Sequence, residues 1–153
     1  MAVEAAQADW EDRAVTNADA DTPRRPLTLV GYWGDSQVAT GWPDVHDFVD
    51  DNWDSDERLE VGLYVTYGLV ARAWMGYSRC RFCGQQNGDL DLTDGIYLWP
   101  QGLAHYVLEH NVRLPDQFVQ HVRRQEELAD GVRVDDTWWR QYQPPPESGN
   151  SPG

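Results

Sequence analysis

Two cysteines and two histidines in the middle of this 153-residue sequence are spaced as ligands of a metal ion. Cys80 and Cys83 are the only cysteines and have two residues between them, and His105 and His110 follow on their C-terminal side. Zinc prefers thiolate sulfur and imidazole nitrogen and takes four such donors in a tetrahedron. Gly84 supplies the permissive backbone that turns both sulfurs toward one point. The pattern predicts a Cys2His2 site for Zn2+.

Other interpretations of these residues stay open. The cysteines could be buried free thiols or a redox pair, although no thioredoxin-like strand-then-helix pattern surrounds them. One of the two histidines could lie on a helix surface, and Asp94, Glu109 or His121 would then complete the site. Asp94 and Glu109 could also support the ligands from outside the four.

A hairpin is predicted between the cysteines and the histidines. Asp94 and Gly95 form a strong two-residue turn signal between apolar segments. Pairing about that turn places Leu92 opposite Tyr97, which gives the hairpin one apolar face.

A helix is predicted to carry both histidines. Pro100 suits its first turn, and Asn111 suits the left-handed position just past its end. His105 and His110 are five residues apart, which leaves them about 140° apart on an ideal helix. Both can bind one ion only if the last turn loosens. The order of knuckle, hairpin and helix resembles the treble-clef class of zinc modules.

The remaining periodicity predicts two strands and three helices. They are a strand over 27–33, a short helix over 43–51, a helix from about 55 to 67, a strand over 69–77 and a helix that ends at Gly131. The helix over 55–67 is expected to bury Leu59, Leu63 and Tyr67, and the last helix to bury Phe118, Val119 and Val122.

The predicted fold class is α+β: a small antiparallel sheet or hairpin with packed helices and a treble-clef-like zinc module. The single domain covers residues 27–142, between a disordered acidic arm at 1–26 and a disordered tail at 143–153 that is rich in proline, glycine and serine. Trp138 and Trp139, near the end of the domain, are expected to cap an edge of the core. An exposed tryptophan pair would instead anchor a partner.

The chain is strongly acidic, with a formal net charge of −14. All twelve basic residues are arginines, and residues 61–83 contain Arg72, Arg79 and Arg81 but no acid. Residues 35–60 contain nine acids and one arginine. The sequence has no apolar run that would span a bilayer and no secretory signal pattern, so a soluble, cytoplasmic protein is expected.

The favoured function is a non-enzymatic adaptor that binds another protein, with zinc in a structural role. A site closed by four protein ligands leaves no position for water, which catalysis needs. A zinc-dependent hydrolase or nuclease with Glu109 as general base is one alternative. Another is nucleic-acid binding through Arg72, Arg79, Arg81 and the knuckle, with Phe82 stacking on a base, against which the net charge argues. A third is an acidic inhibitor or immunity-type protein that acts through residues 35–60.

A longer signature carries a family resemblance. The segments CRFCG and LTDGIYLWPQGLAHYVLEHNVRLP, with VGYW and WPDVHDFVD upstream, resemble an uncharacterised family of small bacterial proteins over roughly residues 29–122. The resemblance implies that Cys80, Cys83, His105 and His110 are the zinc ligands. It implies no activity.

Overall fold

A computed structural model describes residues 25–34 and 41–144. Most of the predicted arm at 1–26 and tail at 143–153 lies outside these residues. In chain order the elements are β1 (Thr28–Leu29), the 3-10 helix η1 (Val45–Phe48), α1 (Ser55–Thr66), β2 (Leu69–Ala73), β3 (Leu90–Thr93), β4 (Tyr97–Pro100), α2 (Leu103–His110), α3 (Asp116–Asp130) and α4 (Thr137–Gln141). The fold is α+β.

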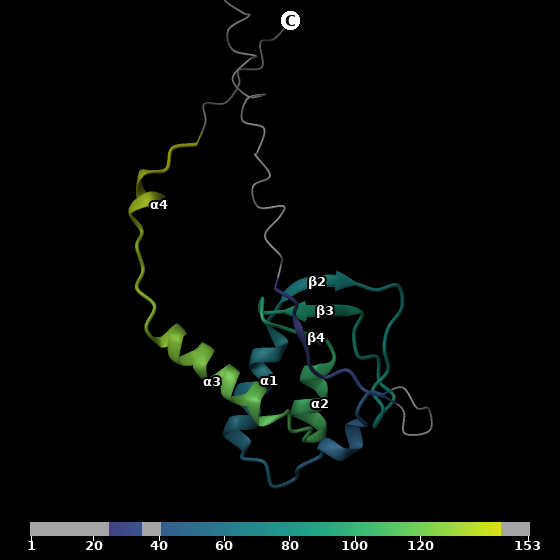
Figure 1. Cartoon of the computed structure of the whole chain (residues 1–153). Coiled ribbons are helices and arrows are strands. Elements are labelled where there is room, and N and C mark those ends of the chain that lie inside the picture. The colour runs from purple at the N-terminus through teal and green to yellow at the C-terminus, as the bar shows by residue number, and fades with distance from the viewer. Residues whose placement is uncertain (1–24, 35–40, 145–153) are drawn as a thin grey trace, which may run out of the picture.

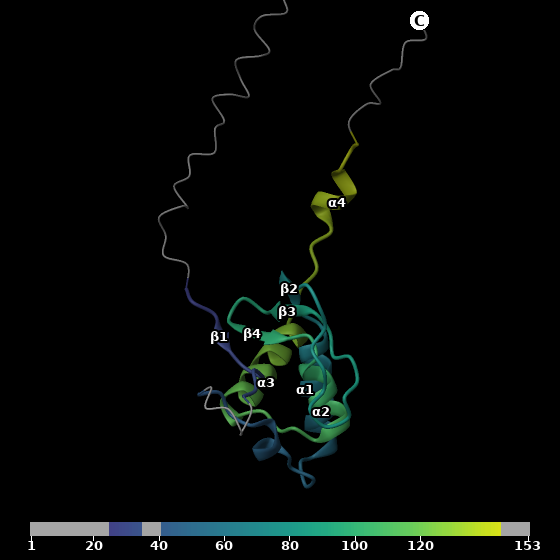
Figure 2. The ribbon, with the colours of Figure 1, turned by 90° about the vertical axis from the view of Figure 1, so that its right-hand side faces the viewer.

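The four strands form one sheet in the order β1-β4-β3-β2. β2, β3 and β4 are antiparallel to their neighbours, but β1 runs parallel to β4, so the sheet is mixed and the prediction of an antiparallel sheet holds for three strands only. Helices α1, α2 and α3 lie on one side of the sheet (Figures 1 and 2).

The register of the β3–β4 hairpin differs from the prediction. Leu92 pairs with Trp99 rather than with Tyr97, because the connection is longer than two residues. The Asp94 carboxylate accepts hydrogen bonds from the backbone N–H groups of Ile96 (2.8 Å) and Tyr97 (2.7 Å). These bonds stabilise a wider loop, which a two-residue turn signal does not anticipate.

The helix that carries the histidines begins later than predicted. Pro100 is the last residue of β4, and α2 starts at Leu103 after Gly102. A Cβ atom on Gly102 would lie 2.3 Å from the Asn87 side chain. Only glycine therefore allows the helix to start directly against the segment that follows the cysteines.

Helix α1 buries a different face from the one predicted. Leu59, Leu63 and Tyr67 are exposed, whereas its buried residues are Val61, Gly62 and Val65. A Cβ atom on Gly62 would lie 2.3 Å from the Leu108 side chain of α2, so the two helix backbones approach closely there. Small and β-branched residues suit such a contact better than the larger leucines.

The core lies between the helices and the sheet. Phe118, Val119 and Val122 of α3 are buried, as predicted, and Gly131 follows the end of that helix. Trp99 is fully buried, and its indole N–H donates to the Val65 carbonyl at 2.9 Å, which ties β4 to α1. No helix of the described ranges is long and apolar enough to span a membrane.

Three elements are shorter than their predicted ranges. The strand expected over 27–33 is Thr28–Leu29, the helix expected over 43–51 is the single 3-10 turn Val45–Phe48, and the strand expected over 69–77 ends at Ala73. A backbone pairing between Val49 and Val112 closes the 3-10 turn against the end of α2.

Trp138 and Trp139 do not cap the core. They lie on α4, and the two residues are 71% and 68% exposed. The segment after α3 extends away from the sheet and helices, and α4 stands apart from them (Figures 1 and 2). The Trp138, Trp139 and Tyr142 rings contact one another, with centroids 5.7 to 5.9 Å apart.

Candidate metal centre

A hairpin-like knuckle holds the two cysteines. Residues 78–88 fold back on themselves, and the backbone N–H of Cys80 donates to the Gln85 carbonyl at 2.9 Å. The N–H of Gly84 donates back to the Cys80 carbonyl at 2.9 Å. Gly84 has a φ of +71°, the left-handed conformation that the turn after Cys83 requires. Cys80 is buried and Cys83 is exposed.

The end of α2 is widened, as the sequence requires for two histidines five residues apart. The backbone N–H of Asn111 donates to the Tyr106 carbonyl five residues back, instead of the four of a regular α-helix, and Asn111 has a φ of +51°. A wider turn brings residues five apart closer to one face. The predicted loosening and the predicted left-handed Asn111 are both confirmed.

The four predicted ligands converge. The ligand atoms of Cys80, Cys83, His105 and His110 all lie within 4.8 Å of one another. Cys83 Sγ is 3.3 Å from His105 Nε2, and His110 Nε2 is 3.1 Å from the same nitrogen. In a tetrahedral zinc site the bond lengths place ligand atoms about 3.3 to 3.8 Å apart. These residues could hold a metal ion.

Aromatic side chains pack around the cluster. The Phe82 ring, between the cysteines, stacks on His110 with centroids 4.7 Å apart and an interplanar angle of 22°. The Tyr106 hydroxyl accepts a hydrogen bond from the Arg81 backbone N–H at 3.0 Å, which joins the knuckle to α2. Burial and the nearby His105 lower the pKa of His110. A neutral imidazole is the form that binds a metal.

The alternative ligands do not join the cluster. Glu109 is exposed on α2 and is not one of the four grouped residues. Asp94 and His121 contact each other instead, with His121 Nε2 2.6 Å from Asp94 Oδ2. The Cys2His2 set is complete without Glu109, Asp94 or His121.

Asp94, His121 and Tyr64 form a second polar cluster, which the sequence did not reveal as a unit. The Tyr64 hydroxyl donates to Asp94 Oδ2 at 2.6 Å. Burial raises the pKa of Asp94, but the hydrogen bonds from Tyr64, the Tyr97 N–H, His121 and the Ile96 N–H outweigh it, so the net pKa is lowered. The cluster ties α1, the β3–β4 loop and α3 together. Periodicity gives no signal for it, because the partners are far apart in the chain.

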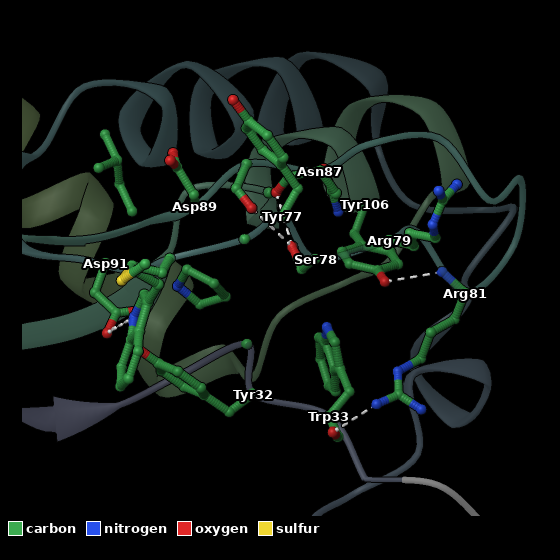
Figure 3. A pocket seen from close by; sticks show the side chains of 18 residues that line it. Tyr32, Trp33, Tyr77, Ser78, Arg79, Arg81, Asn87, Asp89, Asp91 and Tyr106 are labelled. Atoms are coloured by element: carbon green, nitrogen blue, oxygen red, sulfur yellow. Dashed lines mark hydrogen bonds between the residues drawn. The ribbon is translucent and has the colours of Figure 1, made fainter.

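The predicted basic surface is partly committed to internal contacts. One Arg81 guanidinium nitrogen donates to the Trp33 carbonyl at 3.1 Å (Figure 3). One guanidinium nitrogen of Arg79 donates to the Gly84 carbonyl at 3.2 Å. Arg72 pairs with the buried Asp91 at 3.1 Å. Phe82 is half-buried against His110, so that face of its ring is not free to stack on a base.

Many acids in the described part of residues 35–60 have structural partners. Asp54 caps α1 by accepting from two backbone N–H groups, and Asp51 accepts from Asn111 at 3.0 Å. Glu57 accepts from the Trp53 indole at 2.5 Å and pairs with Arg123. Helix caps and ion pairs within the chain therefore account for these acidic residues, and no basic binding protein is needed to explain them.

Comparison of the chain with models of protein families, with curated proteins and with solved structures found no match.

Proposed function

We propose that this chain is a zinc-stabilised, non-enzymatic module that binds another protein. The convergence of four protein donors at the knuckle and α2 carries the proposal. Two thiolates and two imidazoles make a borderline-soft set that favours zinc over magnesium or calcium, which prefer oxygen.

The ligand count favours a structural role for the ion. Four protein donors complete a tetrahedron, and a catalytic zinc site keeps one position for water or substrate. The order of knuckle, hairpin and helix supports a treble-clef-like module. The two histidines are not spaced as on a regular helix, because His110 is the last residue of α2, where the turn is widened.

The surface proposed to bind the partner is an aromatic cluster made of Trp138 and Trp139 of α4 and of Tyr142, which directly follows that helix. Most of each tryptophan ring is exposed, and clustered tryptophan and tyrosine rings are the side chains that most often anchor protein interfaces. A short aromatic helix at the end of an extended segment suits a groove on another protein.

The variant Trp138→Ser/Trp139→Ser tests the interaction. We expect its melting temperature to stay within about 2 °C of wild type, because exposed side chains contribute little to stability. Cross-linking capture from cell extract identifies the partner. The purified partner should then bind the variant at least tenfold more weakly than wild type, a loss of about 1.4 kcal/mol.

Arg124→Gln, on the exposed part of α3, is the matched surface control and should bind the purified partner like wild type. Equal affinity of wild type and the tryptophan variant would exclude α4 as the interaction surface. Hydrolytic turnover that disappears on chelation while the fold survives would overturn the non-enzymatic proposal.

A further inference from the structure

A cavity of about 570 Å³ lies beside the metal centre. It is bounded by the segment after β1, by the chain that leads from β2 into the knuckle, and by the start of β3 (Figure 3). Its volume is in the range of pockets that hold small molecules. Five aromatic side chains line it: Tyr32, Trp33, Trp74, Tyr77 and Tyr106. This lining offers flat apolar faces to a ligand.

Two hydrogen-bonding groups in the lining have no hydrogen-bond partner among the residues that the structure describes. Asn87 is 7% exposed, and within the described ranges no residue hydrogen-bonds to its side-chain amide. The indole Nε1 of Trp33 is buried and has no partner among the same residues. Buried polar side chains are almost always satisfied, so the unpaired Asn87 amide indicates a ligand that complements it. The Trp33 Nε1 atom has almost no accessible surface, so a ligand in the cavity does not reach it.

One side of the cavity is rigidly built. The buried Asp91 carboxylate accepts from the Tyr32 hydroxyl and from the Trp74 indole, both at 2.9 Å, and Arg72 neutralises it at 3.1 Å. Burial and the hydrogen bond to Asp91 raise the pKa of Tyr32, which keeps its hydroxyl protonated. Two aromatic rings are therefore fixed before any ligand binds, which reduces the entropy lost on binding.

The other side is basic. Arg79 and Arg81 line the cavity on the side away from Asp91 in Figure 3. Each uses one guanidinium nitrogen for a backbone carbonyl, and a guanidinium has five N–H donors. The donors that remain suit a phosphate or carboxylate.

We propose that this cavity binds a free mononucleotide. A nucleobase is a planar ring that stacks on aromatic side chains. Its edge presents neighbouring hydrogen-bond donors and acceptors, and the Asn87 amide can pair with both because it has an NH2 donor and a carbonyl acceptor. The Trp33 ring adds an aromatic face for the base, and the phosphate faces Arg79 and Arg81. A base within single-stranded nucleic acid has the same chemistry, but a chain with a net charge of −14 repels a polyanion more than a mononucleotide.

The test is calorimetric titration of the full-length, zinc-loaded chain with AMP, GMP, CMP and UMP. Saturable binding of at least one of them is expected, and the matching nucleoside should bind about tenfold more weakly because it lacks the phosphate. Short single-stranded oligoadenylate should bind more weakly than AMP. Tighter binding of the oligonucleotide would replace the mononucleotide with nucleic acid as the ligand.

Two near-isosteric variants locate the site. Asn87→Asp removes the amide donor, and Trp33→Phe reduces the aromatic area that faces the base. Each should weaken binding of the preferred nucleotide about tenfold. Arg79→Gln should remove most of the difference between nucleotide and nucleoside, and Arg124→Gln should leave it unchanged. Thermal melts show which variants stay folded. If Asn87→Asp does not fold, Trp33→Phe alone tests the site.

Absence of saturable binding of all four nucleotides to the wild-type chain would overturn the proposal. So would equal affinity of the wild type, Asn87→Asp and Trp33→Phe. Neither result bears on partner capture by α4, which depends on different residues.

Discussion

Replacing Cys83 by serine is expected to lower the melting temperature of the zinc-loaded protein by at least about 10 °C and to reduce the bound zinc together with it. Cys83 is exposed, so the substitution removes almost no packing. Its sulfur lies 3.3 Å from His105 Nε2, within the convergent cluster. Any large loss of stability must therefore come from the lost ligand. Differential scanning calorimetry with zinc analysis of the same samples measures both quantities.

The control for this experiment is in the same loop. Gln85 is exposed and uses its backbone carbonyl to accept from Cys80, so Gln85→Ala should melt like wild type. In excess chelator, wild type and Cys83→Ser should melt at the same temperature. Loss of zinc from Cys83→Ser with no change in melting would show that the ion does something other than hold the fold.

Replacing Asp94 by alanine is expected to lower the free energy of unfolding by about 3 kcal/mol, because three donors, two of them part-buried, lose their acceptor at once. The carboxylate holds the Tyr64 hydroxyl and two backbone N–H groups of the β3–β4 loop. Urea denaturation measures the change. Asp116→Ala, which removes an exposed carboxylate paired with Arg113, should cost no more than about 1 kcal/mol.

The effect of Asp94 should depend on pH in a defined direction. Its folded-state pKa is lowered, so its contribution is complete above the unfolded pKa of about 3.9 and is lost as the pH falls through the folded pKa. The gap between wild type and Asp94→Ala should therefore be constant near neutral pH and shrink in acid below about pH 4. A gap that widens in acid would contradict the hydrogen-bonded carboxylate.

The metal ligands could be predicted because their signals are local. Cys80, Cys83 and Gly84 define the knuckle within a few residues, and Asn111 marks where the helix must end. The core face of α3 was also predictable, because Phe118, Val119 and Val122 recur at helical spacing. Spacing and residue type were sufficient in each case.

The errors arose where distant segments decide the structure. The face of α1 depends on the close approach of Gly62 to Leu108, which helical periodicity cannot show. The hairpin register depends on Asp94, which Tyr64 and His121 hold from two other helices. The unpaired amide of Asn87 likewise becomes visible only when the cavity is formed.

The most direct test is native mass spectrometry of tag-free protein, with a thermal melt before and after a strong chelator. One zinc per chain and a cooperative melt that collapses on chelation, and returns when zinc is restored, are the predicted result. A chain that carries no metal, or that keeps its melt after the metal is removed, would contradict a structural zinc site at Cys80, Cys83, His105 and His110.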